Sequence, residues 1–132
     1  EVRAVVASTG LAGRVRFLGE LDHDGLERAY ASADVLVHAA HFEAYGMVLT
    51  EALQRGLPVV STPAGALDGM RSGAVQVVDG PDIAAAIMQW VSNPERMARA
   101  RSAARLMTFP GWGDQAQELA SVLGVHRSEG GA

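Results

Sequence analysis

The sequence contains no cysteine and no lysine, and each absence excludes a group of mechanisms. Without cysteine, the chain cannot use disulfides, thiol catalysis or cysteine-ligated zinc. Without lysine, it can form neither a Schiff base nor a Walker A phosphate-binding loop, because both depend on a lysine amine. All 11 basic residues are therefore arginines.

Net positive charge and long hydrophobic runs are also missing. The 132 residues carry a formal net charge of −4, which argues against a nucleic-acid partner. No apolar run approaches the roughly 18 residues of a membrane-spanning helix. No series of charged, apolar and small residues typical of a signal peptide opens the chain. The apolar content of 48% suffices for the buried core of one soluble domain. With neither a signal peptide nor a membrane span in view, we expect a cytoplasmic protein, either free or peripheral at the membrane.

The spacing of the apolar residues predicts alternating strands and helices. Apolar runs predict strands at Val15–Leu18, Val35–Ala39, Val59–Thr62 and Val75–Val78. Helical spacing and capping residues predict helices at Glu1–Ser8, Asp24–Ala33 and Met47–Arg55, after Asp82, after Asn93, and at about Asp114–Leu123, with a short helical turn after Gly65. This order is typical of an α/β fold, a Rossmann-like parallel sheet with helices on both faces. We expect one domain over residues 1–124 and a frayed tail over residues 125–132.

The loop after the second predicted strand carries the most informative polar residues. Ligands of such sheets bind beyond the carboxyl ends of the strands. Glu43 lies in this loop, Gly46 at the start of the next helix, and Glu51 about one turn into it. A helix N-terminus beside a glycine suits a diphosphate, whereas carboxylates repel phosphate and suit sugar hydroxyls. The pattern therefore fits a nucleotide-sugar site, and it also fits two solvated surface glutamates.

The segment His41–Ser61, HFEAYGMVLTEALQRGLPVVS, resembles the signature of glycosyltransferase family 4, a retaining family with the GT-B fold. Glu43 and Glu51 match its paired glutamates, and the residues from Gly56 to Val60 match its closing G-x-P-V-V. The segments VRFLGEL, LERAYASADVLVHAA, STPAGALDG and FPGWGDQAQELASVL are similar to further family segments in the same order. The resemblance implies an incomplete GT-B C-terminal domain, the domain that binds the nucleotide-sugar donor.

The resemblance also implies a reaction and residue roles. Family members move a sugar from a nucleoside-diphosphate sugar to an acceptor with retained anomeric configuration, generally without a metal or other cofactor. Glu51 matches the glutamate that holds the ribose hydroxyls. Glu43 matches the glutamate near the donor sugar, which makes it the candidate catalytic residue. The other donor-binding candidates are His41, Tyr45, Gly46, Met47 and Val48.

Parts of the family pattern are absent from this sequence. By resemblance, Val15–Leu18 is the third strand of a doubly wound sheet and Val35–Ala39 the fourth, and the first and second strands would separate them. We therefore expect no direct pairing between these two segments. Residues before Glu1 or a second copy would fill the gap; alternatively, Val15–Leu18 slides in beside Val35–Ala39. The family's N-terminal acceptor-binding domain and its diphosphate-gripping basic pair are also missing, so we expect the chain alone to be inactive.

Several alternatives stay open. His38, His41 and Glu43 are metal-ligating residue types, but histidines three apart in a strand point to opposite faces, which disfavours a metal. The arginine-rich stretch from Arg96 to Arg105 fits a solvated helix face or a peripheral membrane contact. The family's Pro-Ser is replaced by His38-Ala39, so the sequence does not name the sugar; neither does it name the base or the acceptor.

The function itself also has alternatives. The chain could be a non-catalytic sugar-nucleotide-binding or partner subunit of a split transferase. It could also be a doubly wound domain with another function, such as a sugar-phosphate epimerase. The absence of a G-x-G-x-x-G motif after a strand argues against dinucleotide binding.

Overall fold

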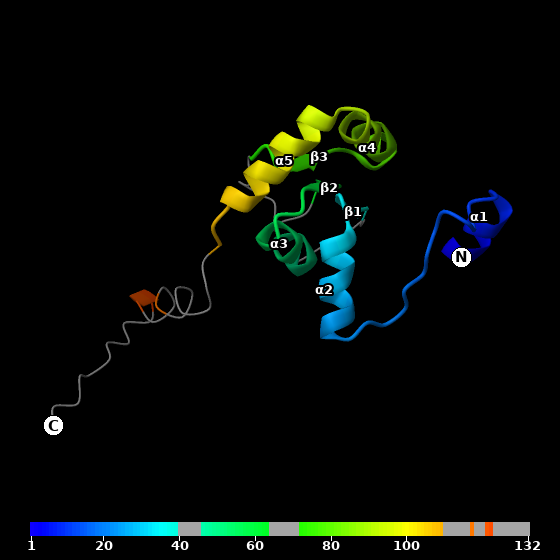
Figure 1. Cartoon of the computed structure of the whole chain (residues 1–132), viewed down its shortest axis with the longest axis horizontal. Coiled ribbons are helices and arrows are strands. Elements are labelled where there is room, and N and C mark those ends of the chain that lie inside the picture. The colour runs from blue at the N-terminus through cyan, green and yellow to red at the C-terminus, as the bar shows by residue number, and fades with distance from the viewer. Residues whose placement is uncertain (40–45, 64–71, 110–116, 118–120, 123–132) are drawn as a thin grey trace, which may run out of the picture. The chain divides into compact units, whose positions relative to one another are not determined.

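The computed structural model describes residues 1–39, 46–63, 72–109, 117, 121 and 122. The chain divides into two compact units, Glu1–Ser32 and Ala33–Ala132. Figure 1 shows the helices and strands of each unit. The predicted domain end at residue 124 stays a prediction.

The first unit contains two helices, α1 (Val2–Ser8) and α2 (His23–Ser32). Gly10 follows α1 with a φ of 71°, a left-handed conformation that glycine adopts at little cost. The Asp22 carboxylate accepts a hydrogen bond from the Gly25 backbone N–H at 2.8 Å, which stabilises the start of α2. Both predicted helices are confirmed to within about a residue at their ends.

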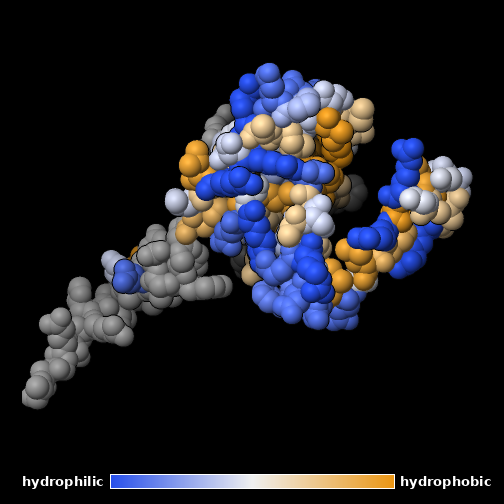
Figure 2. Space-filling view, in the orientation of Figure 1, coloured by the Kyte–Doolittle hydropathy of each residue, from blue (hydrophilic) through white to orange (hydrophobic). Residues whose placement is uncertain are grey.

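The predicted strand at Val15–Leu18 is wrong, because this segment is irregular. The Phe17 ring instead lies 4.2 Å from the guanidinium carbon of Arg3. Its side chain is 40% exposed, and hydrophobic side chains reach the surface of this unit (Figure 2). A strand needs a backbone partner, and the first unit contains no other strand. Val15–Leu18 contributes no strand to the described sheet.

The second unit contains a parallel sheet. Its described strands are β1 (Leu36–His38), β2 (Val59–Ser61) and β3 (Val75–Val77). They are arranged in the order β1-β2-β3, so the other three predicted strands are confirmed and are neighbours. All three residues of β2 are buried, and successive residues point to opposite faces. Both faces of the central strand are therefore covered, as expected for a parallel sheet.

Helices cover this sheet. They are α3 (Met47–Gln54), the 3-10 turn η2 (Gly80–Asp82), α4 (Ile83–Val91) and α5 (Pro94–Leu106). Contacts of α3 with β1 and β2, and of α4 with β2, hold the layers together, and Figure 1 shows α3 and α4 on opposite sides of the strands. The buried residues Val60, Ala86, Trp90 and Ala100 form one core cluster. The predicted turn after Gly65 and most of the predicted helix at 114–123 lie outside the described residues.

The predicted start of α5 is confirmed in detail. The side-chain oxygen of Asn93 accepts a hydrogen bond from the Arg96 backbone N–H at 2.9 Å, and Pro94 occupies the first helical position. Asp82 is the N-cap residue of α4, as predicted, although its side chain makes no capping bond. Within the part of the chain that the structure describes, no helix is long and apolar enough to cross a membrane.

Candidate functional site

The carboxyl ends of the strands lie in register at one edge of the sheet. His38 at the end of β1 is paired in register with Ser61 at the end of β2. The Thr62 N–H donates to the His38 carbonyl at 3.0 Å, and the Val78 N–H donates to the Ser61 carbonyl at 2.9 Å. These bonds keep the ends of the three strands in register at the carboxyl edge of the sheet, which is where ligands of parallel α/β sheets bind.

Helix α3 begins with a glycine N-cap. Gly46 is buried and left-handed, with φ 56° and ψ 31°. Its carbonyl accepts the N–H groups of Leu49 at 2.9 Å and Thr50 at 3.2 Å, which starts the helix. A glycine has no side-chain oxygen to cap the first-turn amides, and these amides carry the positive end of the helix dipole. This N-terminus therefore has the electrostatics of an anion site.

Three of the predicted donor-binding residues share one face of α3. Met47 and Val48 lie four and three positions before Glu51, which places the three side chains side by side on a helix. Met47 is 60% exposed, and Val48 and Glu51 are partly exposed. The opposite face, formed by Leu49, Ala52 and Leu53, is fully buried. The packing of this buried face fixes the rotation of the helix, so that the candidate residues face outward.

The C-terminal end of α3 is held by its neighbour α5. Gly56 has a φ of 72°, and the Leu57 N–H donates back to the Ala52 carbonyl at 2.9 Å, which ends the helix. A Cβ added at Gly56 would lie 2.7 Å from Cγ of Arg105 on α5. The absence of a side chain therefore permits this close approach. Helix α3 is thus held at its C-terminal end and along its buried face.

The predicted site is described only in part. Gly46 caps α3, and Met47, Val48 and Glu51 lie on it; their role in donor binding stays a prediction. The candidates His41, Glu43 and Tyr45 lie outside the described residues. Among the residues that the structure describes, no group of three histidine, cysteine, aspartate or glutamate side chains could hold a metal.

One residue at this edge was not singled out from the sequence. Ser61 is fully buried, and its hydroxyl donates to the Thr62 carbonyl at 2.7 Å. It ends the otherwise apolar strand β2 at the carboxyl edge. The sequence did contain a signal for this residue, because Ser61 is the polar residue that ends an apolar run.

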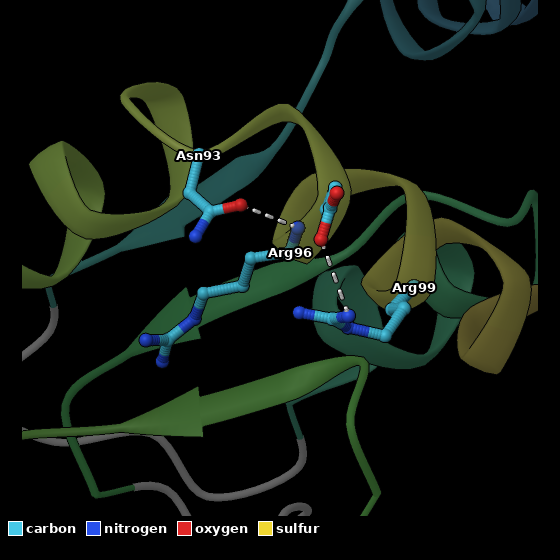
Figure 3. A network of polar contacts seen from close by, with 4 residues as sticks. Asn93, Arg96 and Arg99 are labelled. Carbon is cyan, nitrogen blue, oxygen red and sulfur yellow. Dashed lines mark hydrogen bonds and ion pairs between the residues drawn. The ribbon is translucent and has the colours of Figure 1, made fainter.

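The arginines of α5 do not form one uniform face. Arg96 donates to the side-chain oxygens of Gln76 on β3 at 3.1 Å and Gln89 on α4 at 3.3 Å. Arg99 is paired with Glu95 one turn earlier at 3.7 Å. Figure 3 shows both arginine side chains and marks the ion pair of Arg99 with a dashed line. Arg96 therefore ties α5 to the sheet, while Arg99 lies at the surface.

The sequence matches the model of a known protein family. The sequence model described as "Glycosyl transferases group 1" matches residues 1–107. The chain belongs to this family. The predicted relationship to GT-B glycosyltransferases is confirmed at this level, and so is the predicted Rossmann-like α/β fold.

Individual similar proteins and solved structures match the chain to different extents. The D-inositol 3-phosphate glycosyltransferase of Rhodococcus opacus (strain B4) is 35% identical over 99 residues, which are 71% of this chain but 22% of that protein. The C-terminal domain of a group 1 glycosyl transferase from Francisella tularensis has a TM-score of 0.68 at 22% identity, over 79% of this chain and 56% of that domain. WaaG, a glycosyltransferase involved in lipopolysaccharide biosynthesis, has a TM-score of 0.75 at 23% identity, over 99% of this chain and 36% of WaaG. The chain thus spans about a fifth of the first of these proteins.

Proposed function

We propose that this chain supplies part of the donor site of a retaining, family 4 glycosyltransferase, which moves a hexose from a nucleoside-diphosphate sugar to an acceptor. The observation that carries the proposal is the outward face of α3, where Met47, Val48 and Glu51 follow a glycine-capped N-terminus. Helix α3 follows β1 in the chain, so its N-terminus is at the carboxyl edge, where α/β sheets bind ligands. Membership of the group 1 family supports the same function.

In the proposed complex, the two ends of this face bind different parts of the donor. The diphosphate lies against the first-turn amides, where the helix dipole stabilises its negative charge. The same dipole stabilises the charge that develops on the diphosphate as the sugar leaves. Glu51 is four residues beyond Met47, or about 6 Å along the helix axis. Its carboxylate accepts hydrogen bonds from the ribose hydroxyls at that position.

The residues of the preceding loop complete the proposal. By their resemblance to the family, Glu43 lies near the donor sugar as the candidate catalytic residue, and His41 contacts the sugar. The backbone at Tyr45 continues the amide surface that begins at Gly46. The proposal requires no metal, because the backbone dipoles of this chain and basic side chains supplied from outside the 132 residues stabilise the leaving group.

A non-catalytic subunit is the less favoured alternative, because the matched relatives are named as glycosyltransferases. We still expect the 132-residue chain alone to be inactive. By resemblance to the family, the acceptor-binding domain and the basic pair lie outside these 132 residues, so the isolated chain should be unable to orient the substrate or stabilise the developing charge fully. Steady transfer of a donor sugar by the purified chain would contradict this part of the proposal.

Calorimetric titration with UDP-, GDP- and ADP-hexoses tests the donor site. Glu51→Ala removes a charge-assisted hydrogen bond that contributes on the order of 1.5–3 kcal/mol, so binding of the preferred donor should weaken about tenfold or more. Glu95→Ala is the matched control, because it removes an exposed helical glutamate from α5. An unchanged affinity in a folded Glu51→Ala variant would contradict the assignment of Glu51.

A further inference from the structure

A hollow of about 590 Å³ opens beside α4 and α5. Its described apolar lining residues are Trp90, Val91, Pro94, Met97 and Ala98. Its described polar lining residues are Asp34, Arg101, Ser102 and Arg105. The volume lies within the range of about 300–1,000 Å³ that is typical of small-molecule sites. None of the residues proposed to bind the donor is among these lining residues.

The apolar and polar parts of the hollow lie at different ends. Trp90, at the end of α4, is 2% exposed and packs in the core cluster, so core packing fixes its position in the apolar wall. Val91 beside it is 59% exposed although it is apolar. Arg101 and Arg105 lie in the C-terminal half of α5, and the axial distance from Met97 to Arg105 is about 12 Å. The hollow therefore changes from apolar to cationic along α5.

The two arginines of the hollow differ in their partners. Arg101 is paired with Asp34, which compensates its charge. Among the described residues, Arg105 has no ion-pair partner, so two arginines and one aspartate leave the lining with a net charge of +1. The Arg105 stem passes over Gly56, close to where a Cβ would lie, and this packing restricts it. Within the described ranges, the side chain is therefore a partly restrained cation that no acidic side chain pairs with.

We propose that this hollow is a second ligand site, which binds an amphiphilic organic anion. The apolar chain of the ligand packs against Trp90, Val91 and Met97. The guanidinium of Arg105 and the hydroxyl of Ser102 donate to its phosphate or carboxylate oxygens. Arginine suits this role because its planar group can donate two parallel hydrogen bonds to either anion.

Fluorescence titration of the full 132-residue chain tests the proposal. Trp112→Phe leaves Trp90 as the only tryptophan, so the emission reports on the hollow. Octyl phosphate and octanoate, kept below their micelle concentrations, should give saturable changes, and their relative affinities identify the preferred headgroup. Inorganic phosphate can make only the polar contacts of the proposed ligand, and octanol supplies the apolar chain without the anionic group. Each should therefore bind at least about tenfold more weakly than octyl phosphate or octanoate.

A matched pair of arginine variants locates the binding. Arg105→Gln should weaken binding of the better amphiphile about tenfold or more, because it removes the charge-assisted hydrogen bond. Arg99→Gln makes the same change on α5 outside the hollow and should leave the affinity unchanged. Equal losses in the two variants would overturn the proposal, and so would a response to anionic vesicles but not to the monomeric amphiphiles. Either result would indicate general attraction to the arginine-rich helix.

Discussion

The two compact units respond differently to similar stretches of sequence. Val15–Leu18 in the first unit and Val59–Ser61 in the second are both short and mostly apolar. The second segment is a fully buried strand between two parallel neighbours, whereas the first is irregular and exposed. Of the first 32 residues, all described, only Tyr30 is buried. Apolar patterning therefore gives a tendency to form a strand, and the neighbouring strands decide whether one forms.

The same difference separates the parts of the chain that carry function. A helix can present side chains in a fixed direction only if its other face is held. In the second unit, the buried face of α3 holds Glu51 outward. In the first unit, α1 has no buried residue. The described part of the proposed donor site therefore lies entirely on the unit with the core.

The largest expected contrast is between two leucines. Leu53 on α3 is fully buried, and Leu53→Ala should lower the free energy of unfolding by about 2–5 kcal/mol through lost burial and a cavity. Leu18 in the first unit is 47% exposed, and Leu18→Ala should change it by no more than about 0.5 kcal/mol. Urea unfolding measures both. Equal losses would show that the first unit has a core of its own.

A pair of glycines sharpens the comparison. Gly10 and Gly56 have nearly the same φ, 71° and 72°. Gly56→Ala should cost about 1–2 kcal/mol for the left-handed conformation, and the approach of Arg105 adds to this. Gly10→Ala meets open space in a unit without a core, so its strain should hardly change the main unfolding transition. Comparable shifts of the urea midpoint would contradict this expectation.

The helix cap of α5 is expected to have a moderate effect. Asn93→Ala removes the side-chain acceptor of the Arg96 N–H and should destabilise the second unit by about 1 kcal/mol. Ser92→Ala, one residue earlier, is the control, and it should have little effect on the melting temperature. If the two variants melted alike, the cap would not contribute to stability.

The smallest expected effects distinguish two arginines of α5. Arg96→Ala removes two side-chain hydrogen bonds to Gln76 and Gln89 and should cost about 1 kcal/mol. Arg99→Ala removes an exposed ion pair with Glu95, which is typically worth no more than about 0.5 kcal/mol. Thermal unfolding at low and high salt measures the loss of stability in each of the two variants. A larger loss of stability for Arg99→Ala than for Arg96→Ala would contradict the interpretation that Arg96 ties α5 to the sheet while Arg99 lies at the surface.

Much of the second unit could be predicted from the sequence, because its local signals agree with its packing. The apolar run around Val60 is a buried parallel strand, and the Asn93-Pro94 pair starts a helix. The buried face of α3 follows from the spacing of Leu49, Ala52 and Leu53. Val15–Leu18 could not be predicted correctly, since strand formation depends on partners that its local sequence does not specify. The hollow was also not predicted, because it combines Asp34 with helix residues about 60 positions later.

The central claim is that the glycine-capped N-terminus and outward face of α3 bind a nucleoside-diphosphate sugar. Amide chemical-shift mapping of the full ¹⁵N-labelled chain, titrated with the donor that binds most tightly, tests this directly and tolerates weak binding. The account predicts that the largest shifts gather at the amides of Gly46, Met47, Val48 and Glu51 and at the ends of β1 and β2. Shifts confined to other parts of the chain, or none at millimolar donor, would contradict it.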